Sequence, residues 1–191
     1  DATDETGQEK VHLGGWSLGG AIALDVAVAR PERVASLTLV EAQAWWVMRA
    51  LGLEPPDYDD LVKGFERFRV ADVDEQALSA FLHMVGAVKP GEDAREQRGW
   101  RLAVANRQAL PFSITVINTE RDPGVLADLA MPVLLSEGDS SQPFDHAITE
   151  GLARLIPHAE RLVLPGNHTS HLTNLDAFLD RFEALLARAS A

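Results

Sequence analysis

Short apolar runs and helical periodicity alternate at the start of the chain. Residues 11–14 form an apolar run that ends in glycine, and residues 18–29 are almost all small or apolar. Residues 34–40 are β-branched and aliphatic, which is typical of a strand buried on both faces. The pattern predicts a strand, a tight turn and a buried helix, followed by a second strand parallel to the first.

The middle of the chain, residues 42–130, changes to the period of amphipathic helices. One helix would present Leu61, Phe65 and Phe68 on a single face, and a second would present the apolar residues between 78 and 85. This part of the chain is therefore expected to be a helical insertion rather than part of a sheet.

The last third returns to alternating strands and helices. Strands are predicted at 132–137 and 161–164, and helices at 144–156 and 175–186. Together these patterns predict an α/β fold with a mostly parallel sheet and a helical cap inserted in mid-chain. We assign residues 1–41 and 131–191 to the α/β core and residues 42–130 to the cap.

Composition narrows the classes of partner and location. The 29 acidic residues exceed the 17 basic ones, and the net charge of -12 disfavours nucleic acid and anionic membranes as partners. The chain has no cysteine, so it can form neither a disulfide nor a thiolate metal site. It has no apolar run of the roughly 20 residues that a membrane helix needs and no signal-peptide pattern. We therefore expect a cytoplasmic protein.

The start of the chain is polar and lacks an initiating methionine. It opens on Asp1 and stays polar as far as Lys10, before the first apolar run. We therefore expect the chain to be a piece of a longer protein. The first two predicted strands would then expose an apolar sheet edge, which favours association of the chain with itself, for example as a homodimer.

The segment Gly15-Trp16-Ser17-Leu18-Gly19 stands between the first predicted strand and the first predicted helix. A sharp turn there would force the central residue into a strained conformation, and small neighbours would leave room for it. Ser17 would then be exposed as a nucleophile. The Leu18 N–H, at the positive end of the helix, would stabilise an oxyanion.

Three segments resemble landmarks of the α/β-hydrolase family in their usual order, namely residues 12–20, residues 131–138 and Leu164-Pro165-Gly166-Asn167-His168. The resemblance covers nearly the whole chain outside the cap. It implies an enzyme that uses Ser17 as nucleophile and His168 as general base, without a cofactor. His171, three residues further on, is the competing histidine.

The acidic partner of the histidine is left open between two residues. In most of the family an aspartate lies three residues after the glycine that ends the penultimate strand, and this chain has Ser141 there. Asp139 lies directly after that glycine. Glu41 resembles the residue that some members carry at the end of the strand after the elbow helix. We rank Glu41 ahead, because a charge at the end of a buried strand needs a partner.

These residues predict acyl transfer on an ester-like carbonyl of a small molecule. Six aromatic residues of the insertion would either line a pocket for an apolar acyl group or pack in the core: Trp45, Trp46, Phe65, Phe68, Phe81 and Trp100. No metal-ligand spacing, phosphate loop or dinucleotide motif appears, so we expect neither a metal nor another cofactor. Two alternatives are a carbon–carbon bond hydrolase of the same fold and a non-catalytic ligand-binding or incomplete hydrolase. The second would lack the early loop that supplies another oxyanion donor.

Overall fold

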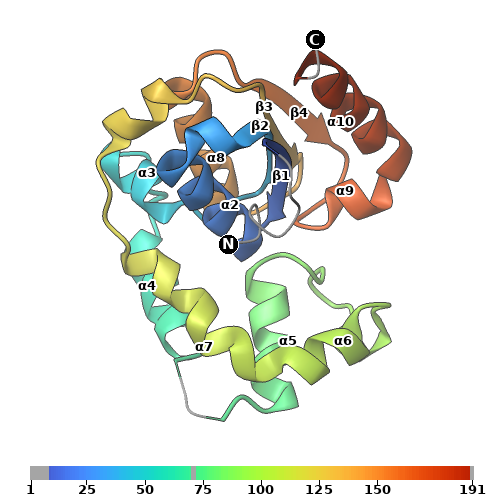
Figure 1. The fold of residues 1–191 in the computed structure, drawn as a ribbon. Coiled ribbons are helices and arrows are strands. Elements are labelled where there is room, and N and C mark those ends of the chain that lie inside the picture. Colours follow the sequence, from blue (N-terminus) through green and yellow to red (C-terminus); the bar gives the residue numbers. More distant parts are fainter. Residues whose placement is uncertain (1–8, 70–71, 190–191) are drawn as a thin grey trace.

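A parallel sheet of four strands forms the centre of the protein (Figure 1). The computed structural model describes residues 9–69 and 72–189, so most of the polar stretch at residues 1–10 lies outside the described residues. The strands are β1 (Val11–Trp16), β2 (Val34–Val40), β3 (Val133–Gly138) and β4 (Glu160–Leu164), paired in this order. The predicted α/β fold with a parallel sheet is confirmed.

Helices cover both faces of this sheet. Helix α2 (Leu18–Ala29) joins β1 to β2, and α8 (Pro143–Leu155) joins β3 to β4. Figure 1 shows α2 and α8 on one side of the sheet and α10 (Leu175–Ala189) on the other. Parallel strands need such crossover helices, which explains why β2 and β3 are buried over almost their whole length.

The chain between β2 and β3 is helical, and most of it gathers beyond one end of the sheet (Figure 1). Its α-helices are α3 (Trp45–Ala50), α4 (Tyr58–Glu66), α5 (Glu75–Met84), α6 (Trp100–Asn106) and α7 (Leu110–Ser113). The 3-10 helices of the protein are η1 (Pro31–Arg33), η2 (Ala94–Glu96), η3 (Arg107–Ala109), η4 (Ile114–Asn118) and η5 (Pro123–Asp128), and α9 (Ser170–Thr173) precedes α10. None of the described helices is long and apolar enough to cross a membrane.

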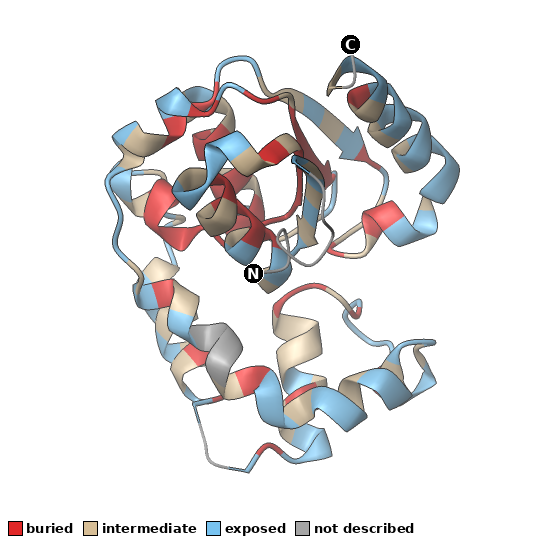
Figure 2. Ribbon diagram, viewed as in Figure 1, coloured by how far each residue is buried: buried red, intermediate tan, exposed pale blue. Residues whose placement is uncertain are grey.

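An aromatic cluster connects the helical insertion to the sheet region. Trp45 stacks on Phe144 of α8 with ring centroids 4.9 Å apart, and Phe65 of α4 meets Trp45 edge-on at 5.2 Å. Phe65 in turn contacts Phe81 of α5. In Figure 2 the buried residues run through β2, β3 and α8 and continue into α3. Core packing is therefore one role of these aromatic residues.

The turn between β1 and α2 leaves no room for side chains at two glycines. A Cβ on Gly15 would lie 2.1 Å from the carbonyl oxygen of Gly19, and one on Gly20 would lie 2.7 Å from the Cβ of Ala42. Gly19 has nothing within 4 Å of the same position. Close packing around the turn therefore requires glycine at positions 15 and 20, but not at position 19.

We expect Gly20→Ala to lower the free energy of unfolding by about 1–3 kcal/mol, because the added methyl group overlaps Ala42 in a packed region. Gly19→Ala is the matched control, one residue earlier in the same helix. It should be neutral or stabilising by up to about 1 kcal/mol, since alanine favours the helix. Urea denaturation measures both, and equal effects of the two substitutions would contradict the proposed crowding.

Candidate active site

Ser17 stands at the tip of the turn between β1 and α2 in a strained backbone conformation. Its φ of 55° and ψ of -123° lie in a region that non-glycine residues rarely adopt. The Ser17 N–H donates to the Val40 carbonyl at 2.9 Å, and the Ser17 carbonyl accepts from the N–H groups of Gly20 and Gln43 at 3.0 and 3.1 Å. Neighbouring strands thus hold the turn in place, and Leu18 begins α2 with an N–H that has no partner inside the helix.

Glu41 follows directly on β2 and is also strained, with a φ of 43°. Its N–H donates to the Ser136 carbonyl at 2.9 Å, which fixes it against β3. The residue is 2% exposed, and its Oε1 accepts from the Gly138 N–H at 2.7 Å and from the Ser141 hydroxyl at 2.5 Å. Ser141 occupies the position where the resemblance places an aspartate, so here a hydroxyl at that position binds the carboxylate from the neighbouring strand.

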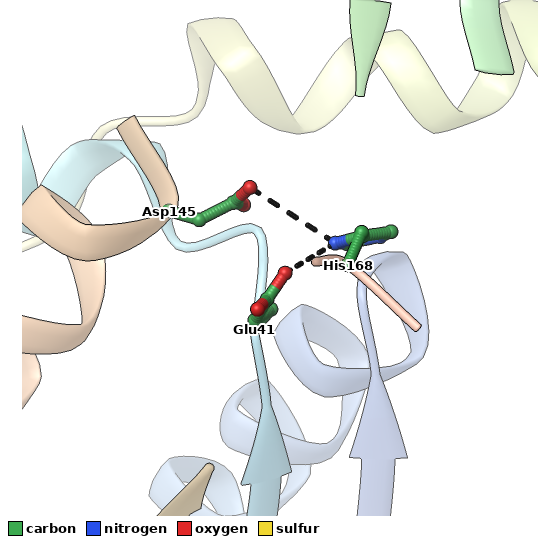
Figure 3. Close-up of side chains that lie close together, drawn as sticks. All are labelled: Glu41, Asp145 and His168. Atoms are coloured by element: carbon green, nitrogen blue, oxygen red, sulfur yellow. Dashed lines mark hydrogen bonds and ion pairs between the residues drawn. The ribbon is translucent and has the colours of Figure 1, made fainter. Parts of the chain in front are cut away.

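His168 lies in the loop after β4 and contacts Glu41 (Figure 3). Its Nδ1 is 2.6 Å from Glu41 Oε2, and the residue is 3% exposed. Trp16 packs beside the ring at a centroid distance of 5.2 Å and donates its Nε1–H to the His168 carbonyl at 3.0 Å. Since Nδ1 is bonded to Glu41, Nε2 is the nitrogen that remains for proton exchange.

No hydrogen bond joins the Ser17 hydroxyl to His168 among the described residues. Ser17 opens into a pocket, whereas His168 reaches the same end of the sheet from the β4 side. Hydrogen bonds of this kind are often long without substrate and tighten when it binds.

The pKa values of Glu41 and His168 move apart, as expected for a hydrogen-bonded acid and base. Burial alone would raise the pKa of Glu41, but the bond to His168, the charge of that ring and the bonds from Ser141 and Gly138 lower it. Burial alone would lower the pKa of His168, yet the bond to Glu41 and the nearby carboxylates raise it. Glu41 is therefore held as a carboxylate that favours the protonated ring.

Asp139 and His171 lie elsewhere in this region. Asp139 is exposed, and its Oδ1 accepts from the Gly166 N–H and the Ser140 hydroxyl, both at 2.9 Å. These bonds lower its pKa and tie together the loops after β3 and β4. His171 is buried against Trp16, with ring centroids 5.0 Å apart, and its pKa is lowered by burial and by the charge of His168. No hydrogen bond or ion pair joins Asp139 to His168 among the described residues.

Asp145 is a buried carboxylate beside His168 that the sequence patterns did not single out. It lies in the first turn of α8, where an acidic residue ordinarily needs no explanation beyond the helix dipole. In the fold it is 1% exposed, and its Oδ2 is 4.0 Å from His168 Nδ1. The sequence predicts this helix at 144–156, but nothing local in the sequence indicates that its first turn is buried against a distant histidine.

A narrow apolar pocket opens in front of Ser17. Its lining comes from the turn, from α3 and from the insertion, with Gln43 and Ser17 as its polar members: Ser17, Leu18, Gln43, Trp45, Phe65, Phe81, Val85 and Ile117. The cavity measures ≈ 30 Å³, which is room for a small group only. Trp45, Phe65 and Phe81 therefore line a pocket as well as packing in the core.

Glu41, Asp145 and His168 offer three ligand atoms within 4.8 Å of one another, so a metal ion has to be considered. However, both oxygens of Glu41 and the Nδ1 of His168 already take part in hydrogen bonds. A metal would have to displace each of these bonds. The arrangement is better suited to holding an imidazole and its proton than to coordinating a cation.

Comparison with known proteins gives the family. The family model described as alpha/beta hydrolase fold matches residues 1–175. The pimeloyl-[acyl-carrier protein] methyl ester esterase of Klebsiella pneumoniae is 28% identical over 181 residues, which cover 91% of this chain and 68% of that protein. The esterase of the same name from Nitrosomonas europaea is also 28% identical, over 90% of this chain and 69% of its own length.

Solved structures agree on the fold. A hydrolase from Pseudomonas aeruginosa has a TM-score of 0.75 at 22% identity and is matched over 97% of this chain and 68% of its own. A thermophilic esterase has a TM-score of 0.71 at 20% identity, over 98% of this chain and 71% of its own. With a strained serine between strand and helix, a histidine after the last strand and a family model covering most of the sequence, the chain belongs to the alpha/beta hydrolase fold family.

Proposed function

We propose that the protein hydrolyses carboxylic esters by acyl transfer, with Ser17 as nucleophile, His168 as general base and Glu41 as the acid that orients the histidine. The observation that carries this proposal is the buried 2.6 Å contact between Glu41 and His168. A carboxylate in that position selects the ring tautomer with its proton on Nδ1 and stabilises the imidazolium. The similarity to two methyl ester esterases supports an ester as the substrate.

The reaction would proceed in two steps. Nε2 of His168 takes the hydroxyl proton of Ser17 as its oxygen attacks the carbonyl carbon, and the resulting oxyanion accepts a hydrogen bond from the Leu18 N–H. The protonated ring then gives its proton to the departing alkoxide, which leaves as an alcohol. Water, deprotonated by the same nitrogen, then attacks the acyl-enzyme, and the ring returns this proton to the serine oxygen as the acid leaves.

The pocket in front of Ser17 supports a small-molecule ester with an apolar acyl group. Gln43 is the amide in its lining, and that amide is already engaged with Trp45, Asp145 and the Glu41 carbonyl. The remaining lining is aromatic or aliphatic apart from Ser17 itself. Apolar walls bind an acyl chain by removing it from water and offer no partner for a charged one.

Ser17→Ala should abolish ester hydrolysis, lowering kcat by about four to six orders of magnitude, because no other group forms the acyl-enzyme. A fluorophosphonate probe should label the unaltered protein and leave Ser17→Ala unlabelled. Ser140→Ala is the control, since Ser140 is exposed and bonds to Asp139 instead. Labelling of Ser17→Ala at the level of the control would refute the nucleophile.

Glu41→Gln should lower kcat by about three to four orders of magnitude, whereas Asp139→Asn should lower it less than about tenfold. The pH profile separates the two roles further. Glu41 raises the pKa of His168, and activity is lost as the pH falls through that pKa. Loss of the carboxylate should therefore move the acid limb of kcat/KM to lower pH. A larger effect of Asp139→Asn on both readouts would transfer the acid role to Asp139.

Val85→Ala should widen the pocket and favour longer acyl chains. We expect the ratio of kcat/KM for p-nitrophenyl octanoate to that for the acetate to rise about tenfold. Val88→Ala is the matched control, because Val88 is also buried in the insertion but does not line the pocket. If both substitutions change the ratio alike, the cavity in front of Ser17 does not hold the acyl chain.

A further inference from the structure

Two carboxylates, rather than one, face the ring of His168. Figure 3 shows Glu41 and Asp145 approaching the same ring nitrogen from different elements. Glu41 reaches Nδ1 at 2.6 Å, while Asp145 Oδ2 stops at 4.0 Å. The longer distance is beyond a hydrogen bond, so Asp145 interacts with the ring through its charge.

The side chain of Asp145 is held so that one oxygen stays unpaired. Its Oδ1 accepts from Gln43 Nε2 at 3.0 Å, and the Gln43 Oε1 accepts from Trp45 Nε1 at 2.8 Å. Because the indole can only donate, the Gln43 amide cannot be flipped and its nitrogen must face Asp145. Oδ2 has no hydrogen-bond partner among the described residues, and it is the oxygen nearest to His168.

A buried oxygen without a partner is costly, so its position needs an explanation. The ion-pair partner of this oxygen among the described residues is the imidazolium of His168, at 4.0 Å. In the proposed reaction that cation forms twice, when Ser17 attacks the ester and when water attacks the acyl-enzyme, and each time it lasts until the ring gives its proton away. The contact is therefore unfavourable or neutral in the resting protein and favourable in the transition state, which is the requirement for an interaction that speeds a reaction.

The titratable groups that face His168 among the described residues are Glu41 at the end of β2, Asp145 in α8 and His171 in α9. Burial and the charge of Glu41 raise the pKa of Asp145 to about 7, although the His168 charge opposes this. The lowered pKa of His171 leaves that ring neutral near pH 7. The charges of Glu41, Asp145 and His168 therefore affect one another's protonation.

We propose that Asp145 is a positioning residue that acts through His168, stabilising the protonated ring during acyl transfer and orienting it when Glu41 is absent. This role rests on the proposed function of Ser17 and His168. Glu41 accepts the direct hydrogen bond from Nδ1, and Asp145 provides a second negative charge 4.0 Å from the same nitrogen. The two carboxylates are thus partly interchangeable.

A double-substitution cycle tests this overlap. Asp145→Asn alone should lower kcat by about threefold to tenfold with KM unchanged, and in the Glu41→Gln protein it should lower kcat at least tenfold more than it does alone. Glu150→Gln is the control, since it removes a carboxylate from the same helix at an exposed ion pair with Arg154 and Arg161. Equal factors for Asp145→Asn in both backgrounds would overturn the proposal.

The titration of the ring provides a readout that a structural role would not move. In nuclear magnetic resonance of Ser17→Ala, the His168 ring should titrate at a lower pH when Asp145→Asn is added, because a nearby negative charge has been removed. An unchanged His168 titration would overturn the proposal. If Asp145→Asn does not fold, the carboxyl carbon of Asp145 in the unaltered protein should show a titration step at the same pH as the His168 ring, because the two groups lie 4.0 Å apart, and independent titration of the two overturns the proposal instead.

These measurements separate the two proposals from each other. The titrations need no ester turnover, so a coupled Asp145 and His168 in a protein that hydrolyses no ester would refute the proposed function alone. Ester hydrolysis that is lost in Ser17→Ala, together with independent titration of Asp145 and His168, would refute the role of Asp145 alone.

Discussion

The buried carboxylate of Glu41 is the group on which the arrangement of the site depends. A charge with 2% exposure needs hydrogen bonds from every side, and Glu41 obtains them from the end of β3, from the loop after it and from the loop after β4. Removing one partner of such a set leaves an uncompensated charge in the interior. The requirement to satisfy Glu41 therefore fixes the positions of Gly138, Ser141 and His168 relative to one another.

Two strained residues mark the same end of the sheet. Ser17 and Glu41 each follow a strand directly and each have a positive φ, at 55° and 43°. Conformations of this kind cost of order 1–3 kcal/mol and persist where the surroundings determine them fully. Here the N–H of Ser17 is fixed on β2 and that of Glu41 on β3, so the paired strands supply the constraint. The strain places both side chains above the ends of the strands, where loops from other elements can reach them.

The helical insertion lines the pocket and supplies none of the proposed catalytic residues. Phe65 and Phe81 reach the pocket in front of Ser17 from α4 and α5, while Trp45 connects them to α8 through stacking on Phe144. Trp45 also donates to Gln43, and Gln43 donates to Asp145. A continuous series of contacts therefore connects the pocket lining to the carboxylates beside His168. A substitution in the lining can alter the position of these carboxylates through it.

The sequence by itself determined the order of strands and helices, the turn at Ser17 and the place of His168 after a Pro-Gly pair, because these depend on local periodicity and on the steric demands of a tight turn. The predicted strand and helix ranges match β1 to β4, α2, α8 and α10 within a few residues. The tertiary structure decided which carboxylates contact the histidine. Glu41 and His168 are 127 residues apart, and the parallel register of β2 with β3 and of β3 with β4 is what joins them. No periodicity or motif records such a register, so the sequence placed Glu41 only slightly ahead of Asp139 and did not indicate Asp145. Burial and the distance to His168 separate the three carboxylates in the structure.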